Sequence, residues 1–175
     1  MHILIVEDNR VNQKVTQRLL QRLGCTFAIA WNGQEALDYL SSPPTTCPRP
    51  DIILMDLAMP IMSGHQALSI IRSQPPFTTD PVIPTIPIIA LSASQMPGET
   101  QRLAGLGFDD SIPKPIRSER LRKVILYWSG RRVVPRQGGP PGVPVPRSGN
   151  WVPVSAAAVW GPMPLRAFRG PRSLL

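Results

Sequence analysis

Cysteine is scarce in this 175-residue sequence, and long apolar runs are absent. Two cysteines, Cys25 and Cys47, are too few for a disulfide framework, so we expect a reduced, intracellular protein with Cys25 in its core. The longest apolar runs fall far short of a membrane span. The first residues lack the cationic start and the long apolar stretch of a signal peptide. These absences favour a cytoplasmic protein with no membrane partner and leave the nucleus open.

Two further shortages argue against whole classes of site. Only two histidines occur, His2 and His65, and neither has a partner at metal-ligand spacing, so a histidine metal centre is not expected. No glycine-rich phosphate loop follows the first apolar run, which argues against a redox enzyme that binds flavin. The chemistry must therefore come from carboxylates, lysine and hydroxyl groups.

Acidic residues are missing altogether from residues 129–175, which contain seven arginines, nine prolines and seven glycines. Residues 1–128 contain 12 Lys and Arg against 11 Asp and Glu, so the net charge of +8 belongs mostly to the tail. A segment of the tail's composition cannot bury enough apolar surface to offset its ordering entropy. We predict a folded domain over residues 1–128 and a disordered tail over residues 129–175. We expect no nucleic-acid partner, because such a tail is more typical of a solvated polycation.

Short apolar runs alternate with helical patterns along residues 1–128. The runs have the length of strands buried on both faces, and they are Ile3–Val6, Thr26–Ala30, Ile52–Met55, Ile86–Leu91 and Phe108–Ile112. The helical patterns cover Val11–Leu23, Ala36–Leu40, Ala67–Ile71, Leu103–Leu106 and Leu121–Trp128. Five β–α units in a row predict a parallel sheet with helices on both faces. Two proline-rich connections, residues 41–50 and 74–87, are predicted to be surface insertions.

Polar residues end four of the predicted strands: Glu7-Asp8, Asp56, Ser92 and Lys114. Parallel strands end at one edge of a sheet, and the order 2-1-3-4-5 makes the first and third strands neighbours. We therefore expect Glu7, Asp8 and Asp56 to share a pocket. Two carboxylates about 4 Å apart repel by about 4 kcal/mol at an effective dielectric of about 20, so positive charge must offset them. Mg²⁺ suits an oxygen-only site that binds phosphate, and Lys114 supplies a second positive charge.

A carboxylate nucleophile, a metal ion, a lysine and a hydroxyl together indicate phosphoryl transfer. A carboxylate is already ionised at neutral pH, so Asp56 needs no histidine as general base. We therefore predict a protein that takes a phosphoryl group onto Asp56 and responds by changing shape. We do not expect an enzyme that turns over a small-molecule substrate.

Several stretches, in order and spread over about residues 2–128, carry a resemblance to a known family. They are Ile3–Asn9 with Asn12-Gln13, Asn32–Leu37, Asp51–Pro60 with Gly64, Ile88–Ala93, and Asp109–Pro115. Together they resemble the receiver domains of response regulators in two-component phosphorelays, especially receivers fused to hybrid histidine kinases. The resemblance implies a flavodoxin-like (βα)5 fold, a doubly wound parallel sheet with strand order 2-1-3-4-5.

The resemblance also implies roles for single residues. Asp56 would be the phospho-acceptor and would bind Mg²⁺ with Asp8, with Glu7 through water, and with the backbone carbonyl of Ala58. Ser92 would hydrogen-bond the phosphoryl oxygens, Lys114 would pair with them, and Pro115 would follow through a cis peptide bond. The donor would be the phosphohistidine of a histidine kinase or of a histidine-containing phosphotransfer protein.

Two positions depart from the family pattern. Ser111 stands where the family often has Tyr or Phe, which puts an aromatic switch in doubt. Ala58 offers no amide or acid to position a hydrolytic water, so we expect the phosphate on Asp56 to be relatively long-lived.

These departures keep a second function open, a pseudo-receiver that acts as a protein-interaction module without phosphorylation. A metal-dependent phosphatase is disfavoured because Ala58 stands where such enzymes place a second Asp. A DNA-binding output function is disfavoured because residues 129–175 are too few and too rich in proline for a folded output domain. The chain is either a single-domain relay protein or a piece of a hybrid kinase, unless residues 129–175 are a translation artefact.

Overall fold

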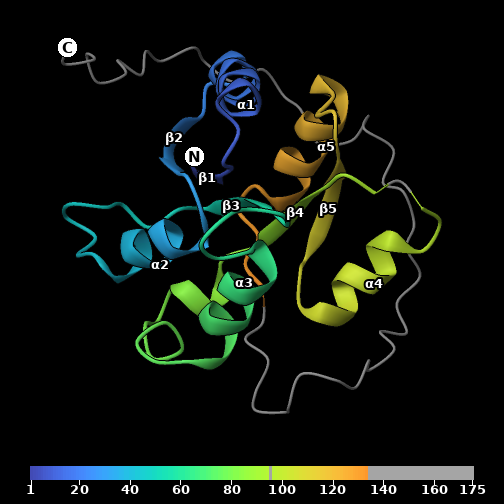
Figure 1. Ribbon diagram of the computed structural model, residues 1–175. Coiled ribbons are helices and arrows are strands. Elements are labelled where there is room, and N and C mark those ends of the chain that lie inside the picture. Colours follow the sequence, from blue (N-terminus) through green and yellow to red (C-terminus); the bar gives the residue numbers. More distant parts are fainter. Residues whose placement is uncertain (95, 134–175) are drawn as a thin grey trace. The chain divides into compact units, whose positions relative to one another are not determined.

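Five parallel strands form one sheet in the order β2-β1-β3-β4-β5 (Figure 1). The computed structural model describes residues 1–94 and 96–133. The strands are β1 (His2–Val6), β2 (Thr26–Ala30), β3 (Ile52–Asp56), β4 (Ile88–Ser92) and β5 (Asp110–Pro113). The helices are α1 (Arg10–Arg22), α2 (Gly33–Ser41), α3 (Gly64–Ser73), α4 (Glu99–Leu106) and α5 (Ser118–Trp128), and a short 3-10 helix, η1 (Ile83–Thr85), precedes β4. The predicted flavodoxin-like fold and its strand order are confirmed.

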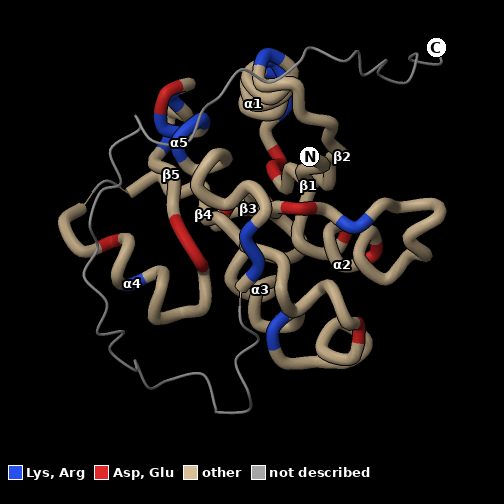
Figure 2. Tube along the Cα trace, turned by 180° about the vertical axis from the view of Figure 1, so that it is seen from behind, with Lys and Arg blue, Asp and Glu red and all other residues tan. Residues whose placement is uncertain are grey.

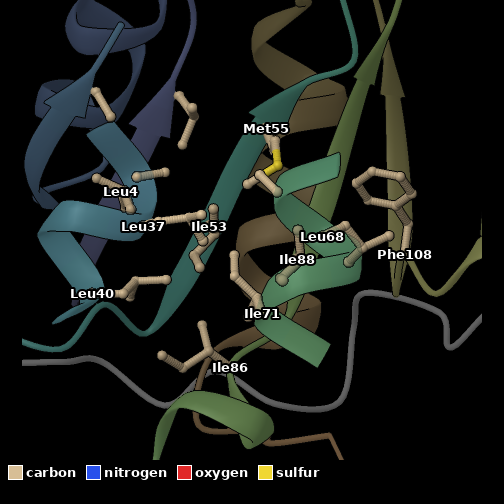
Figure 3. Packing of buried hydrophobic residues seen from close by; sticks show 14 of the residues in the cluster. Leu4, Leu37, Leu40, Ile53, Met55, Leu68, Ile71, Ile86, Ile88 and Phe108 are labelled. Carbon is tan, nitrogen blue, oxygen red and sulfur yellow. The ribbon is translucent and has the colours of Figure 1, made fainter. Parts of the chain in front are cut away.

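The hydrophobic core lies in two layers, one on each face of the sheet. Strand residues alternate between the layers. Leu4, Ile53 and Ile88 belong to the layer that contains the buried residues of α2, α3 and α4, whereas Ile3, Ile52 and Ile89 belong to the layer that contains those of α1 and α5. Figure 3 shows the first layer, in which Leu37 and Leu40 of α2 and several side chains of α3 pack on the strands. Each fully buried Leu or Ile stabilises the fold by about 1.5–3 kcal/mol.

The last strand begins later than its apolar run predicts. Phe108 packs in the core but precedes β5, which starts at Asp110. The carboxylate of Asp109 accepts the backbone N–H of Ile88 at 2.8 Å and a guanidinium N–H of Arg72 at 2.7 Å. A side chain thus takes up the first donor of β4 before the β4–β5 ladder begins.

Helix α1 is rotated relative to its apolar pattern. The apolar residues of this helical pattern are Val11, Val15, Leu19 and Leu23. The first two of them are 69% and 44% exposed. The residues that face the sheet are Gln13, Thr16 and Leu20. The Gln13 side chain donates a hydrogen bond to the backbone carbonyl of Glu7 at 2.6 Å. This bond holds the Gln13 face of the helix toward the sheet. The prediction of a helix here is confirmed.

The two proline-rich insertions are joined to each other and to the core. Arg49 in the first pairs with Asp80 in the second at 2.9 Å. Burial raises the pKa of Asp80, but the N–H groups of Val82 and Ile83 and the Arg49 guanidinium outweigh it, so the pKa lies below its usual value. Phe77 of the second insertion is only 5% exposed and packs in the core. The composition of this insertion predicted that it lies on the surface. That prediction is wrong for Phe77, because its side chain is part of the core.

The chain contacts the domain beyond the predicted boundary at Trp128. The backbone N–H of Val133 donates to the carbonyl of Thr85 at 2.9 Å, and Arg132 pairs with Asp51 at 3.2 Å. The boundary stays a prediction. The predicted disorder of the tail lies, from residue 134 on, outside the described residues. In the part of the chain that the structure describes, no helix is long and apolar enough to cross a membrane.

Candidate functional site

Three carboxylates meet at the carboxyl end of the sheet. Strands β1 and β3 pair in parallel with Val6 opposite Met55, so Glu7 and Asp56, each one residue further along, emerge side by side. Oxygens of Glu7, Asp8 and Asp56 all lie within 4.8 Å of one another. Glu7 and Asp56 are buried, whereas Asp8 is exposed. Glu7 and Asp8 lie in the sequence between β1 and α1, and Figure 2 shows acidic residues in red where β1 leads into α1.

Lys114 lies between two of these carboxylates. Its ammonium nitrogen is 2.5 Å from Oδ2 of Asp56 and 2.8 Å from Oε2 of Glu7. The backbone N–H of Lys114 donates to the carbonyl of Ser92 at 2.8 Å, which fixes the lysine at the end of β4 and β5. Burial lowers the pKa of Lys114, but the two carboxylates outweigh burial and raise it above the usual value. The side chain is therefore a cation at every pH at which the site would work.

Two further residues, which the sequence did not assign to the site, hold Glu7 in place. The Asn12 amide donates to Oε1 of Glu7 at 3.0 Å, and the Gln13 amide donates to the Glu7 backbone carbonyl. Asn9 caps α1 and also donates its backbone N–H to Oε1 at 3.3 Å. Asn9 is the N-cap of α1, whereas Asn12 lies in the first turn of the helix. The sequence contained one signal for the role of Asn12. The residue lies in the first turn of α1, only five residues after Glu7 at the end of β1.

The backbone after Asp56 passes close to the start of α3. A Cβ built on Gly64 would lie 2.1 Å from the backbone oxygen of Asp56, so only glycine fits there. Ala58, the proposed carbonyl ligand, donates its own N–H to Oδ1 of Asp56 at 3.3 Å. The peptide bond before Pro115 is cis, as expected.

The hydroxyls of Ser92 and Ser111 are both directed to α4. Ser92 ends β4, is 2% exposed and donates to Oε1 of Glu99 at 3.2 Å. Ser111, in the position where an aromatic residue is common, is 6% exposed and shares a hydrogen bond of 3.0 Å with Thr100. Sequence reasoning placed Ser92 in the site but did not identify Glu99 as its partner or Thr100 as the partner of Ser111.

The cluster fits a hard divalent cation. Within it, three carboxylates face one ammonium group, so two negative charges are left without a counter-charge. Every candidate ligand atom is an oxygen, which suits Mg²⁺ rather than a softer metal ion. Asp8 is exposed, so the cation would keep access to water on that side. Asp8, Asp56 and Glu7 are the residues that could hold it.

Comparisons with known proteins agree with this geometry. A model of the response regulator receiver domain matches residues 3–126. The chain is 37% identical over 130 residues to Two-component system protein A of Emericella nidulans, covering 74% of this chain but only 17% of that protein.

Two solved structures are similar over most of the sheet and its helices. One is the receiver domain of the sensor histidine kinase PA1611 of Pseudomonas aeruginosa, with a magnesium ion coordinated in its active site cleft. It has 32% identity and a TM-score of 0.59, and the match covers 74% of this chain and 97% of that one.

The other is the receiver domain of Ssk1 in its complex with the histidine phosphotransfer protein Ypd1 of Saccharomyces cerevisiae. It has 29% identity and a TM-score of 0.58, and the match covers 73% and 88% of the two chains. The fold, the acidic cluster and these matches lead to one conclusion: the chain belongs to the family of response regulator receiver domains.

Proposed function

We propose that this receiver accepts a phosphoryl group from a phosphohistidine onto Asp56 and transmits the event as a change of conformation or passes the group on. The observation that carries this proposal is the contact of Asp56 with Lys114 beside Glu7 and Asp8. A buried carboxylate of purely structural role would not need two further acids within 4.8 Å. The chain would react with its donor once per phosphorylation and would not turn over a small molecule.

The residues of the chain divide the work of the transfer. An oxygen of the Asp56 carboxylate attacks phosphorus, and the P–N bond breaks with its electron pair going to the imidazole nitrogen of the donor. Lys114 would pair with a phosphoryl oxygen carried by Asp56, and its hydrogen bond to Oδ2 of that carboxylate supports this role. Ser92 would donate its hydroxyl to another phosphoryl oxygen. The product is an acyl phosphate on Asp56.

Mg²⁺ is the cofactor that we propose, bound by Asp8 and Asp56 directly, by Glu7 through water, and by the backbone carbonyl of Ala58. When bound, it would offset the negative charge that the carboxylates and the phosphoryl oxygens bring together. Support comes from the oxygen-only cluster in this chain and from the magnesium ion in the similar Pseudomonas receiver. A long-lived phosphate, inferred from Ala58, stays a prediction.

The partner that we propose is a histidine kinase or a histidine-containing phosphotransfer protein, in the cytoplasm. The similar receiver of Ssk1 forms a complex with the phosphotransfer protein Ypd1. Because the chain spans only 17% of the fungal protein, the other activities of such relatives are not assigned to it. No observation on the described residues supports the nucleus or a membrane partner.

Transfer from a phosphohistidine donor tests the proposal. The full chain and Asp56→Asn would each be mixed with a histidine phosphotransfer protein that carries labelled phosphate, with Mg²⁺ or with EDTA. We expect label on the wild-type chain only with Mg²⁺, and none on Asp56→Asn. Asp51→Asn is a matched control, because Asp51 lies at the other end of β3 and pairs with Arg132. Label on Asp56→Asn would contradict the proposal.

The pseudo-receiver remains the second candidate, favoured by Ser111 and Ala58. A pseudo-receiver and a working receiver are expected to differ in one measurement, the binding of a phosphoryl mimic. A pseudo-receiver would not bind beryllofluoride, a mimic of the phosphoryl group, in the presence of Mg²⁺. The intact cluster of Glu7, Asp8, Asp56 and Lys114 leads us to expect binding.

A further inference from the structure

The hydroxyl of Ser92 is engaged by α4 and not by the carboxylate cluster. Its oxygen donates to Oε1 of Glu99, the first residue of α4, at 3.2 Å. The same oxygen accepts the backbone N–H of Ser94 at 3.1 Å and lies 3.4 Å from the Ser94 carbonyl, which is a more distant and uncharged alternative acceptor. The Glu99 side chain is 14% exposed, so this hydrogen bond is partly shielded from water. The hydroxyl that phosphoryl binding requires is thus already in use.

Arg102 holds Glu99 in place one turn further along α4. Its Nε lies 3.0 Å from Oε2 of Glu99 and its Nη2 lies 2.9 Å from Oε1, which makes a bidentate pair. The oxygen that accepts from Ser92 therefore also accepts from Arg102. The hydrogen bond from Arg102 lowers the pKa of Glu99 below its usual value, although some burial opposes it; the hydrogen bond from Ser92 and the positive charge of Arg102 lower it further. The carboxylate remains an anion and a strong acceptor at neutral pH.

The first turn of α4 has a second polar contact with the sheet. Thr100 shares a hydrogen bond of 3.0 Å with the buried hydroxyl of Ser111 in β5. Consecutive residues of α4, Glu99 and Thr100, thus bind side chains of two neighbouring strands, β4 and β5. The hydrogen bond between Thr100 and Ser111 joins two short side chains, so a small displacement of either partner breaks it.

A serine hydroxyl has one hydrogen to donate. Ser92 therefore cannot donate to Glu99 and to a phosphoryl oxygen on Asp56 at the same time. We propose that Glu99 is a positioning residue, which holds the Ser92 hydroxyl toward α4 in the unphosphorylated state and releases it when Asp56 is occupied. Phosphoryl binding is thereby coupled to the first turn of α4. This inference rests on the proposed function.

Glu99 and a phosphoryl mimic on Asp56 compete for the Ser92 hydroxyl. The affinity of the full chain for beryllofluoride, with Mg²⁺ present, measures this competition. Glu99→Ala removes the competing acceptor and is expected to bind beryllofluoride about fivefold more tightly than the wild type, since a hydrogen bond to a charged group is at stake. Glu99→Gln keeps the size of the side chain, loses the charge, and is expected to show a smaller gain. It also keeps the test usable if the alanine variant does not fold.

A second background separates positioning from other effects. In Ser92→Ala chains, removal of Glu99 is expected to change the affinity by less than twofold, because the hydroxyl under competition is gone. An effect of charge or of helix stability would persist in that background. Glu119→Ala is the matched control, since Glu119 is also a first-turn acid that pairs with a basic residue, Lys123 at 2.8 Å, but on α5.

The outcomes distinguish this inference from the proposed function. A wild-type chain that fails to bind beryllofluoride would overturn both. Tight binding by the wild type with an unchanged affinity for Glu99→Ala would overturn the inference alone. So would an equal gain in the wild-type and Ser92→Ala backgrounds. A gain that requires Ser92 would support it.

Discussion

Asp8 differs from its two neighbours in the cluster because it is exposed to solvent. A cation bound there would replace water at Asp8 without the cost of opening a buried site. We expect Asp8→Asn to weaken Mg²⁺ binding by about tenfold or more, because the site loses one full negative charge. Calorimetric titration with Mg²⁺ measures the affinity. Asp38→Asn, an exposed acid of α2 that pairs with Gln34, is expected to leave it unchanged, and equal affinities for the two variants would count against the assignment.

Lys114 is the cation that the cluster has without a metal ion. We expect Lys114→Met to lower the free energy of unfolding by about 2 kcal/mol in EDTA, because Glu7 and Asp56 are then buried without a counter-charge. Mg²⁺ is expected to restore more stability to the variant than to the wild type. Urea unfolding with EDTA and with Mg²⁺ gives both numbers.

The control for that change is Lys123→Met. Lys123 pairs with Glu119 on the surface of α5, where the side chains are 68% and 80% exposed, so the loss should stay within about 0.5 kcal/mol. A Lys114 variant as stable as the control in EDTA would show that the lysine does not offset the cluster.

Residues at strand ends were predictable, whereas their neighbours from helices were not. Glu7, Asp56 and Lys114 follow apolar runs, and parallel strands bring such positions to one edge. The contacts of Asn12 and Glu99 depend on which face of a helix turns to the sheet, and apolar spacing does not fix that face for a short polar segment. The resemblance named residues that bind phosphate and metal, but not those that hold them.

At the scale of the elements, the start of α3 is set by one close approach. Gly64→Ala would put a Cβ 2.1 Å from the backbone oxygen of Asp56, so the strand or the helix must shift. We expect a loss of several kcal/mol in the free energy of unfolding, on the order of 3 kcal/mol, and weaker Mg²⁺ binding because Asp56 moves. Thermal or urea unfolding measures the first effect, and titration measures the second.

Gly105 in α4 is the matched position. A Cβ there would meet nothing within 4 Å, and the residue lies inside a helix, so Gly105→Ala should stabilise the protein by about 0.5–1 kcal/mol. A destabilised Gly105→Ala chain, or a Gly64→Ala chain as stable as the wild type, would contradict the described packing.

Helix α1 shows where element prediction succeeds and where it fails. Its repeat of apolar residues predicted a helix, and Gly24 follows it with a φ of 71° as expected of a residue that ends one. The repeat did not predict which side is buried, because Gln13 binds the Glu7 carbonyl and turns Val11 and Val15 outward. The Gln13 hydrogen bond and the burial of Leu20 lie on the same face of the helix, which is not the face of the two valines.

For the molecule as a whole, the two histidines make stability depend on pH. Burial lowers the pKa of both His2 and His65 below the ordinary value of 6.5; for His65 the nearby Arg102 adds to the effect. The folded protein then binds protons more weakly than the unfolded chain. The contribution of the two histidines to stability is therefore constant above pH 6.5, and stability is expected to fall as the pH drops below this value. The carboxylate partners Asp51 and Glu99 moderate the effect.

Melting temperatures between pH 7.5 and pH 5.5 test this dependence. We expect a lower melting temperature at the acidic end for the wild type, and a flatter profile for a chain with His2→Gln and His65→Gln. A wild-type profile that is flat, or that rises toward acid, would contradict the direction of the two pKa shifts.

The central claim is that Asp56 accepts a phosphoryl group with the help of Mg²⁺. The most direct measurement is the intact mass of the full chain after incubation with phosphoramidate or acetyl phosphate, with Mg²⁺ or EDTA, beside Asp56→Asn. We predict one added phosphoryl group on the wild type, only with Mg²⁺, and none on the variant. Folded wild-type protein that gains no mass with Mg²⁺, or a variant that gains the same mass, would contradict the account.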